Sequence, residues 1–370
     1  MARALVIGGT GPTGPGVVRG LLARGYDVSV LHGGQHEVAL PADVRHIHTD
    51  PHWPEGLRDG LGRARFDLVV AQYGRLAVTA EVLAGRTERL VAVGGAHGAL
   101  APADDPRWGA LGRPALVGDT DEHPAVDAAD GPLGGKMAAA ERALLAAHRA
   151  GAFAATLLAY PVLYGPGQPA PHEWCIVRRI LDGRRRIVVA DGGIRLESRL
   201  YTENAVQALL LAVDRPEAVA GRTFVVTDQQ VFTMRQRITF VASRLGADLE
   251  LVDLPFELAG PCHPYWRHGP EHRLRSSTAI RQELGYADPV AAADALAGTV
   301  DWLVENPPAP GGPEEQRLGD PFDYPGEDEL LARWDDHRRE LGPTTAPFRP
   351  THAYRHPRHP DEPWRRPARG

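Results

Sequence analysis

Short apolar runs recur through the first half of the chain, and stretches with helical spacing separate them. The runs predict strands at residues 4–7, 26–31, 44–48, 67–71, 90–93 and 155–159. After the first run, Val17, Val18, Leu21 and Leu22 recur with the spacing of one helix face. Strands that alternate with helices are typical of a parallel sheet with crossover connections.

The clearest helical pattern covers residues 136–149, which are rich in alanine and end just before Gly151. The segment immediately before it contains Gly131, Pro132, Gly134 and Gly135. Glycine and proline both disfavour the interior of a helix, so this segment predicts a different backbone path.

The alternation loosens from about residue 166. Helical patterns at 175–181, 203–213 and 234–245 interleave with strand patterns at 187–190, 223–226 and 249–254. We therefore expect a core over residues 1–165 and a mixed lobe over residues 166–342, with elements that return to the core. A proline- and arginine-rich tail follows at residues 343–370, with a composition that cannot build a core of its own.

A glycine-spaced turn directly follows the first strand, with Gly8, Gly11 and Gly14 at its key positions. Such glycines allow a tight turn, a close approach of backbone to a pyrophosphate, and close packing of helix on strand. The pattern predicts an α/β fold, a Rossmann-type doubly wound parallel sheet with a smaller C-terminal substrate lobe. It also predicts NAD or NADP as cofactor, with contacts from Gly8, Thr10, Gly11, Pro12, Thr13 and Gly14.

Composition narrows the function classes. The formal net charge of -6 gives no footprint for nucleic acid, and no apolar run is long enough to span a membrane. The chain opens with a strand pattern rather than a signal peptide, and its 2 cysteines imply no disulfide framework. We expect a cytoplasmic bacterial protein that acts on a small molecule.

Four later segments complete a pattern, and they are Lys136 with its alanine-rich helix, residues 160–167 (Tyr-Pro-Val-Leu-Tyr-Gly-Pro-Gly), residues 200–205 and residues 278–286. With the glycine turn they make the chain resemble the extended short-chain dehydrogenase/reductases, the NAD-dependent epimerase/dehydratases, over roughly residues 3–304. The resemblance implies a homodimer held by the helix at 136–149 and a partner helix after Val78. It also places Ala71 and Pro161 beside the cofactor.

The resemblance breaks at the catalytic groups. The family's proton-transferring tyrosine, four residues before the lysine, corresponds to Pro132, and its serine corresponds to Gly95. Lys136 is retained and is expected to bind the nicotinamide ribose. His97 and Tyr73 are the candidate replacement acids, with Tyr164 next, because each can be placed beside the same pocket.

Three interpretations stay open for this altered site. The leading one is an NAD(P)-dependent epimerase, dehydratase or reductase-like enzyme with an atypical site, acting on a small polar metabolite or natural-product intermediate. The second is a catalytically silent NAD(P)-binding regulator, and the third is a non-redox lyase or cyclase on the same fold.

The choice between NAD and NADP stays open as well. His32 follows the second predicted strand, and this position lacks both the acidic residue that binds a ribose hydroxyl and the arginine that binds a 2′-phosphate. His32 and Gln35 can contact either form. Asp50 is expected on the adenine side or, equally, as a loop cap.

On the substrate side we expect Tyr164, Glu173, Trp174 and Arg178 to line the pocket, with the arginine suited to a phosphate or carboxylate. The histidines are expected to hold no metal. His263, His268 and His272 are irregularly spaced, and His46 and His48 read as ordinary strand-end residues.

Overall fold

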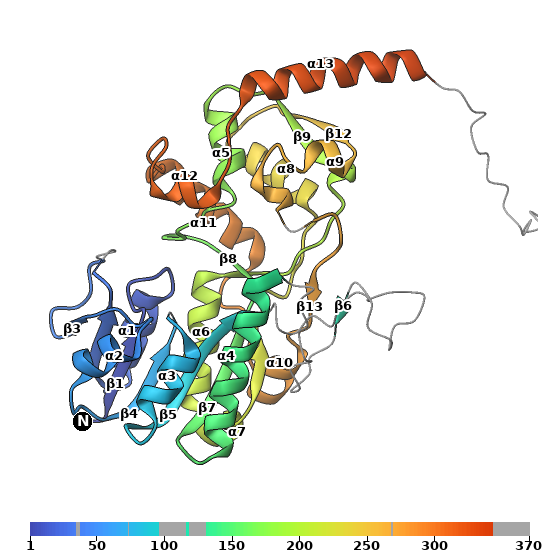
Figure 1. Cartoon of the computed structure of the whole chain (residues 1–370). Helices are drawn as coiled ribbons and strands as arrows, with labels where there is room; N and C mark the ends of the chain where they lie inside the picture. Colours follow the sequence, from blue (N-terminus) through green and yellow to red (C-terminus); the bar gives the residue numbers. More distant parts are fainter. Residues whose placement is uncertain (35–37, 73, 96–115, 118–130, 268, 343–370) are drawn as a thin grey trace, which may run out of the picture. The chain divides into compact units, whose positions relative to one another are not determined.

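A parallel seven-stranded sheet forms the core of the protein (Figure 1). The computed structural model describes residues 1–34, 38–72, 74–95, 116–117, 131–267 and 269–342. The strand order is β11-β7-β5-β4-β1-β2-β3, and neighbouring strands pair in parallel throughout. The strands are β1 (Arg3–Ile7), β2 (Asp27–His32), β3 (Arg45–His48), β4 (Phe66–Ala71), β5 (Thr87–Gly95), β7 (Ala154–Tyr160) and β11 (Thr223–Val225).

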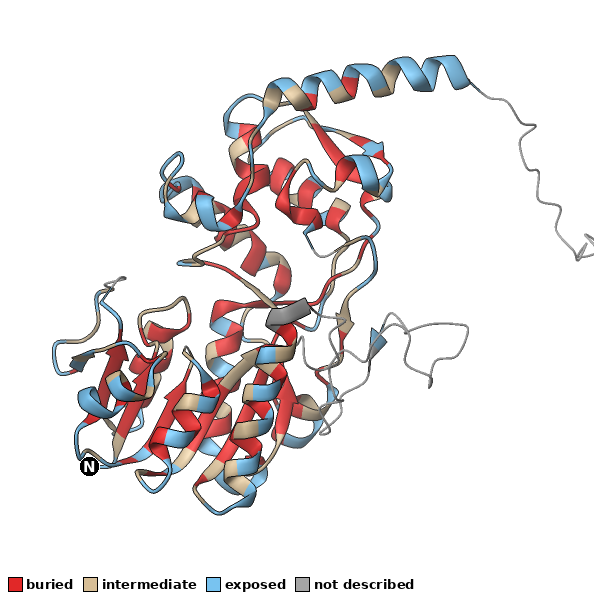
Figure 2. Ribbon diagram, viewed as in Figure 1, coloured by how far each residue is buried: buried red, intermediate tan, exposed pale blue. Residues whose placement is uncertain are grey.

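Helices cover both faces of this sheet, which is the predicted doubly wound arrangement. Apolar residues of α1 (Gly14–Ala23) and α6 (Thr202–Asp214) pack on one face. Those of α2 (Pro54–Leu61), α3 (Leu76–Leu83) and α4 (Gly131–Arg149) pack on the other. Because both faces are covered, the central strands are buried along almost their whole length, as the red strands in Figure 2 show.

Helix α4 corrects the expected backbone path before Lys136. The helix begins at Gly131 and includes Pro132, so the expectation of a non-helical segment is wrong. Proline is tolerated in the first turn of a helix, where its missing N–H would have no intrahelical partner. The six strands predicted in the first half are all present, and no strand end is shifted by more than three residues.

The second half builds a smaller lobe and also returns to the core. Strand β11 adds an edge to the sheet and α6 packs on it. Parallel pairs join β8 (Val162–Tyr164) to β10 (Arg199–Tyr201), β9 (Arg186–Ala190) to β12 (Glu250–Leu254), and β6 (Leu116–Val117) to β13 (Leu274–Arg275). The remaining elements are α5 (Trp174–Leu181), α7 (Pro216–Val219), α8 (Met234–Arg244), α9 (Phe256–Ala259), α10 (Thr278–Leu284), α11 (Ala292–Glu305), α12 (Pro313–Leu318), and short 3-10 helices at Asp191–Gly193 and Pro264–Trp266.

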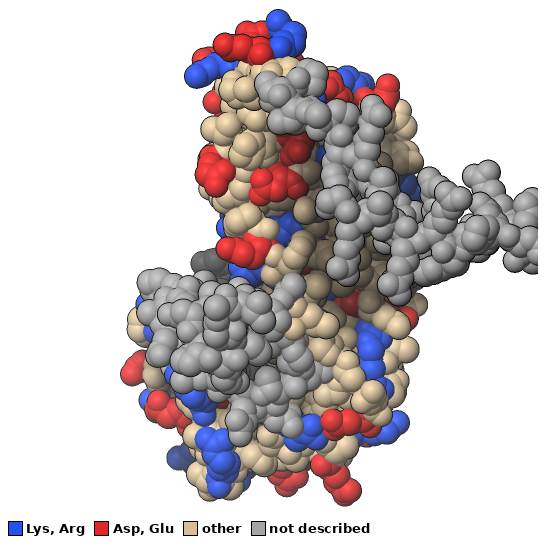
Figure 3. All heavy atoms as spheres, turned by 90° about the vertical axis from the view of Figure 1, so that its right-hand side faces the viewer, with Lys and Arg blue, Asp and Glu red and all other residues tan. Residues whose placement is uncertain are grey.

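Residues Met1–Asp323 form one compact unit, and Tyr324–Gly370 form a second that contains helix α13 (Tyr324–Leu341). The tail at 343–370 lies outside the described residues. Among the helices that are described, none is long and apolar enough to cross a bilayer. Basic and acidic side chains are interspersed over the described residues on the face shown in Figure 3.

Candidate active site

The glycine turn between β1 and α1 has the geometry of a dinucleotide-binding loop. Gly8 has a φ of 83°, which favours glycine, and its N–H donates to the Leu31 carbonyl at 2.9 Å. Gly14 packs directly against backbone, since a Cβ there would lie 2.1 Å from the Gly9 carbonyl oxygen. A Cβ at Gly11 would meet only the Gly8 carbonyl oxygen, at 3.5 Å. The turn therefore keeps its open space at Gly11.

The residues around the turn fit a bound dinucleotide. Helix α1 begins at Gly14, whose N–H donates to the Gly11 carbonyl oxygen at 2.9 Å, and Pro15 has no N–H. The positive end of the helix dipole lies at this turn, where it favours an anion. The Thr13 hydroxyl donates to Gln72 Oε1 at 2.5 Å and joins the turn to the end of β4. The Gln72 amide nitrogen is buried with no hydrogen-bond partner among the described residues. Sequence reasoning missed Gln72, although its position directly after a strand was a usable signal.

The sheet order places this turn at the topological switch point. Strand β1 pairs with β2 on one side and β4 on the other, and open α/β sheets bind ligands at the carboxyl end of this position. Ala71 is the β4 partner of Ile7, and His32 ends β2, so both predicted contacts lie at this edge. A Cβ at Gly167 would lie 3.8 Å from Pro12 Cα, which brings the segment after Pro161 against the turn.

Asp50 adopts the loop-cap geometry. Its Oδ1 accepts the backbone N–H of His52 at 2.9 Å and is 2.6 Å from His52 Nδ1. The backbone and ring hydrogen bonds from His52 lower the pKa of Asp50. The structure thus satisfies this carboxylate within its own loop.

The predicted substrate residues are engaged in structural contacts within the lobe. The Tyr164 hydroxyl donates to Asp228 Oδ2 at 2.7 Å, and burial raises the pKa of Tyr164 far above its usual range. The Trp174 indole and the Arg178 guanidinium both bind Glu315 Oε1, at 2.8 and 2.6 Å. The expected inward-facing arginine is therefore neutralised by a partner that the sequence pattern did not reveal.

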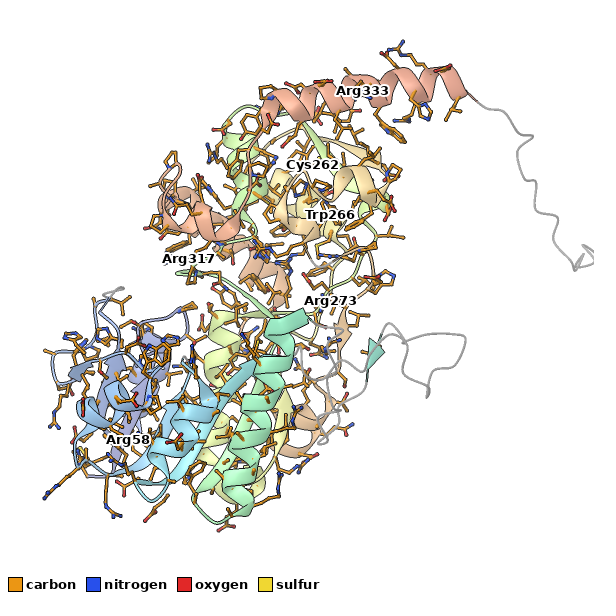
Figure 4. All side chains as sticks on the ribbon, in the orientation of Figure 1. Arg58, Cys262, Trp266, Arg273, Arg317 and Arg333 are labelled. Atoms are coloured by element: carbon orange, nitrogen blue, oxygen red, sulfur yellow. The ribbon has the colours of Figure 1, made fainter. Side chains whose placement is uncertain are left out.

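Glu173 belongs to a buried charge cluster. Its Oε1 accepts from Arg237 at 2.6 Å and from Arg199 at 3.3 Å, and the same Arg199 pairs with Glu197 at 2.9 Å. Burial alone would favour the neutral acid, but the two arginines lower the pKa of Glu173. Nearby, Trp266, labelled in Figure 4, has the Arg195 guanidinium 5.7 Å from its ring centroid.

Two buried histidines of this lobe, His172 and His263, are neutral side chains. Burial lowers the pKa of His172 and of His263 to about 3. His263 Nε2 lies 3.0 Å from the Val188 carbonyl oxygen, and the buried Cys175 Sγ lies 3.9 Å from its Nδ1. These contacts show a packed core. His268 lies outside the described residues.

Comparisons with known proteins decide the family. The model of the NAD dependent epimerase/dehydratase family matches residues 124–227. A 3-diazoavenalumate denitrifying reductase from a Streptomyces species is 31% identical over 258 residues, a match that covers 66% of this chain and 82% of the reductase. The chain belongs to the NAD-dependent epimerase/dehydratase family.

Other relatives agree with this assignment. An uncharacterised protein of Sinorhizobium fredii is 26% identical over 323 residues, covering 78% of this chain and 86% of that protein. The NAD-bound dTDP-glucose 4,6-dehydratase of Bacillus anthracis has a TM-score of 0.63 at 16% identity and covers 83% of this chain and 98% of its own. UDP-glucose 4-epimerase of Thermotoga maritima, with UDP-glucose, has a TM-score of 0.64 at 19% identity, with 82% and 99% covered. The structures share the fold, and the family's cofactor agrees with the predicted NAD or NADP.

Of the three predicted catalytic residues, the structure describes only Lys136. Tyr73 and His97 lie outside the described residues. Lys136 is exposed, and it shares its side of α4 with the exposed residues Ala139, Arg142, Ala146 and Arg149 at intervals of three or four. The neighbouring Met137 is half-buried and lies one turn before the buried Glu141.

Glu141 is a carboxyl group that sequence reasoning missed. Its Oε1 accepts the N–H of Gly95 at 3.1 Å, and a Cβ at Gly94 would lie 2.3 Å from the same oxygen. Burial raises the pKa of Glu141 to about 7, while the bond from Gly95 acts in the opposite direction. The two glycines therefore leave room for this carboxyl group beside the serine position. The signal was its place on the buried face of a long helix.

Proposed function

We propose that this protein is an NAD(P)H-dependent reductase that delivers hydride to a small diazonium compound, with release of N2. The match to the 3-diazoavenalumate denitrifying reductase, over 82% of that enzyme's length, carries the proposal. We place the protein in the bacterial cytoplasm as a homodimer, with the cofactor on the turn from Gly8 to Gly14.

The missing acid and base support reduction over epimerisation or dehydration. Oxidising a sugar hydroxyl requires a base to take its proton, and the family's tyrosine does this four residues before the lysine. If Lys136 is aligned with the family's lysine, the tyrosine position is occupied by Pro132. If the half-buried Met137 is aligned with it instead, the tyrosine position is occupied by Leu133. Neither side chain ionises, so both registers lack the tyrosine.

A diazonium carbon removes the need for that tyrosine. The cofactor supplies hydride for a new C–H bond, the C–N bond breaks with its electron pair going to N2, and NAD(P)H becomes NAD(P)+. No oxygen gains or loses a proton in this reaction. The chain's residues need only bind the dinucleotide, orient the acceptor and exclude water.

The direct test uses the purified protein with cofactor deuterated at the transferred position and a diazonium carboxylate as acceptor. We expect deuterium in the product, one N2 released per NAD(P)H oxidised, and loss of both in the cofactor-turn variant Gly11→Ala. Bound NAD(P)H without turnover would favour the silent regulator. Product without deuterium would favour the lyase or cyclase.

His97 separates a diazonium acceptor from a carbonyl acceptor. If His97 donates a proton to a reduced carbonyl, His97→Ala lowers kcat by about a hundredfold, the scale of a lost general acid. With a diazonium acceptor we expect kcat within about threefold of the parent, because the general-acid contribution is absent from this step. Tyr73→Phe is the matched test of the second candidate acid.

A further inference from the structure

Three histidines come together at the edge of the core sheet. His32 is the last residue of β2, and its register partner on the edge strand β3 is His48. His46 lies two residues earlier on β3, and side chains two apart share a face of a strand. From the sequence, His46 and His48 were expected to be ordinary strand-end residues. Their proximity to His32 follows from the pairing of β2 with β3.

The ring nitrogens are close enough to share one ion. One ligand nitrogen from each histidine lies within 4.8 Å of the other two, and His32 Nε2 is 3.0 Å from His46 Nδ1. The His32 ring centroid is 4.6 Å from that of His48 and 5.2 Å from that of His46. Tetrahedral zinc with bonds of about 2.0–2.1 Å places its ligand nitrogens about 3.3 Å apart. The rings of His46 and His48 are exposed, so solvent rather than packed side chains lies around the two groups that would have to adjust to that spacing.

The chemistry of the donors selects the class of ion. Among the residues that the structure describes, the group contains imidazole nitrogens and no carboxylate or thiolate. Imidazole suits zinc, copper and nickel, whereas calcium and magnesium require oxygen ligands. The buried His32 fixes one ligand on the sheet, and the exposed pair leaves the ion an entry path from solvent.

We propose that His32, His46 and His48 bind one divalent transition-metal ion of the zinc class, with a fourth position open to water or another ligand. The ion ties the edge strand β3 to β2. This site does not depend on the reductase function, and it stands or falls separately.

One hydrogen bond has to open for the ion to bind. The Gly34 N–H donates to His32 Nδ1 at 3.3 Å, which places the His32 proton on Nε2, toward His46. A neutral histidine that binds metal through Nε2 carries its proton on Nδ1. The Gly34 contact is long, and a Cβ added at Gly34 would meet none of the described atoms within 4 Å, so we expect its amide to turn away when the ion binds.

The test is zinc titration of the full-length protein by calorimetry, after removal of metal and of any bound nucleotide. Nucleotide is removed because the end of β2 is also where such folds hold the adenosine ribose. We expect one zinc per chain in the parent protein and at least about 100-fold weaker binding in His46→Ala and in His48→Ala, since a lost ligand costs at least as much as a lost supporting group. The matched control is His52→Ala, which removes a nearby histidine that is paired with Asp50 instead.

A second readout separates the site from loose surface binding. Zinc should raise the Tm of the parent and of His52→Ala, and leave that of His48→Ala unchanged, because an ion that binds only the folded state stabilises it. Absence of stoichiometric binding would overturn the proposal. Equal weakening by His52→Ala and His48→Ala would overturn it too.

Discussion

Single residues of the cofactor turn carry two separable duties, space for a ligand and contact with the protein itself. At Gly11 an added Cβ meets protein only at 3.5 Å, whereas at Gly14 it meets backbone at 2.1 Å. We therefore expect the dinucleotide to require Gly11, whereas the fold requires Gly14.

This difference predicts opposite outcomes for two alanine variants. Gly11→Ala should weaken NAD binding at least about tenfold, because the methyl group occupies the space of the pyrophosphate, and it should leave the Tm unchanged. Gly14→Ala should lower the free energy of unfolding by about 2 kcal/mol through overpacking. Calorimetric titration and thermal unfolding of both proteins check this. Unchanged NAD affinity in Gly11→Ala would contradict the assignment of the turn.

The buried carboxyl group of Glu141 predicts a pH dependence of stability. Burial raises its pKa to about 7 in the folded protein, above the 4.5 of a solvent-exposed glutamate, so folding favours the protonated acid. The contribution of Glu141 to the free energy of unfolding is fully present below pH 4.5. It is lost as the pH rises to about 7, where the carboxyl group ionises in its buried position.

Glu141→Gln removes this effect, because the amide stays neutral and still accepts the Gly95 N–H. We expect the variant to exceed the parent in the free energy of unfolding at pH 8, by up to about 3 kcal/mol, and to match it near pH 4. Urea unfolding at the two pH values measures the difference. If the free energies of unfolding of the parent and the variant differ by the same amount at about pH 4 and about pH 8, Glu141 does not ionise in a buried position.

At the scale of elements, helix α4 shows where sequence reasoning succeeded and where it stopped. The alanine-rich stretch predicted the helix, but the start was wrong, because proline and glycine were weighed as interior residues and lie in the first two turns. The buried residues Ala138 and Glu141 show which side of α4 faces the sheet, and therefore that Lys136 lies on its exposed side. The sequence pattern alone did not give this orientation.

Contacts between distant elements were beyond the sequence pattern altogether. Trp174 and Arg178 were both expected to line the substrate pocket, but their shared partner Glu315 lies more than a hundred residues later. The same holds for His32, which meets His46 and His48 only through the pairing of β2 with β3. Local periodicity specifies elements, and register and packing specify sites.

The cluster that links α5, β10 and α8 predicts a large loss from a small change. Glu173→Gln leaves Arg199 and Arg237 buried without their shared counter-charge, and we expect a loss of about 3 kcal/mol in the free energy of unfolding. The control is Asp301→Asn in the exposed Arg244–Asp301 pair, which should cost less than about 1 kcal/mol. Chemical denaturation of both variants provides the comparison. Similar small losses in the two would show that the buried cluster is screened.

For the whole molecule, the fold followed from the sequence because several local signals agreed. The glycine turn, the apolar strands and the alternation with helices all specify a parallel sheet, and the order of its strands is the doubly wound one. The chemistry did not follow in the same way. Two candidate acids lie outside the described residues. The predicted substrate side chains Tyr164 and Arg178 are bound to carboxylates of the protein itself, Asp228 and Glu315.

The predicted homodimer is a property of the whole molecule that the exposed face of α4 makes testable. Helices α3 and α4 pack side by side on the sheet, and Ala139 and Ala146 on α4 are exposed between charged residues. Small side chains allow close approach of a second copy, and a two-fold contact is complementary to itself. We expect a mass of twice the 40.0 kDa chain by light scattering at micromolar concentration.

Ala139→Glu should convert this dimer to a monomer. A two-fold contact at α4 brings the introduced charge close to its copy, while glutamate is a good helix former and leaves the isolated fold intact. The control Ala287→Glu places the same charge at another exposed alanine and should stay dimeric. Light scattering of the parent and both variants gives the masses, and thermal unfolding checks that each is folded. A dimer that persists in Ala139→Glu would place the interface elsewhere, and a monomeric parent would remove it.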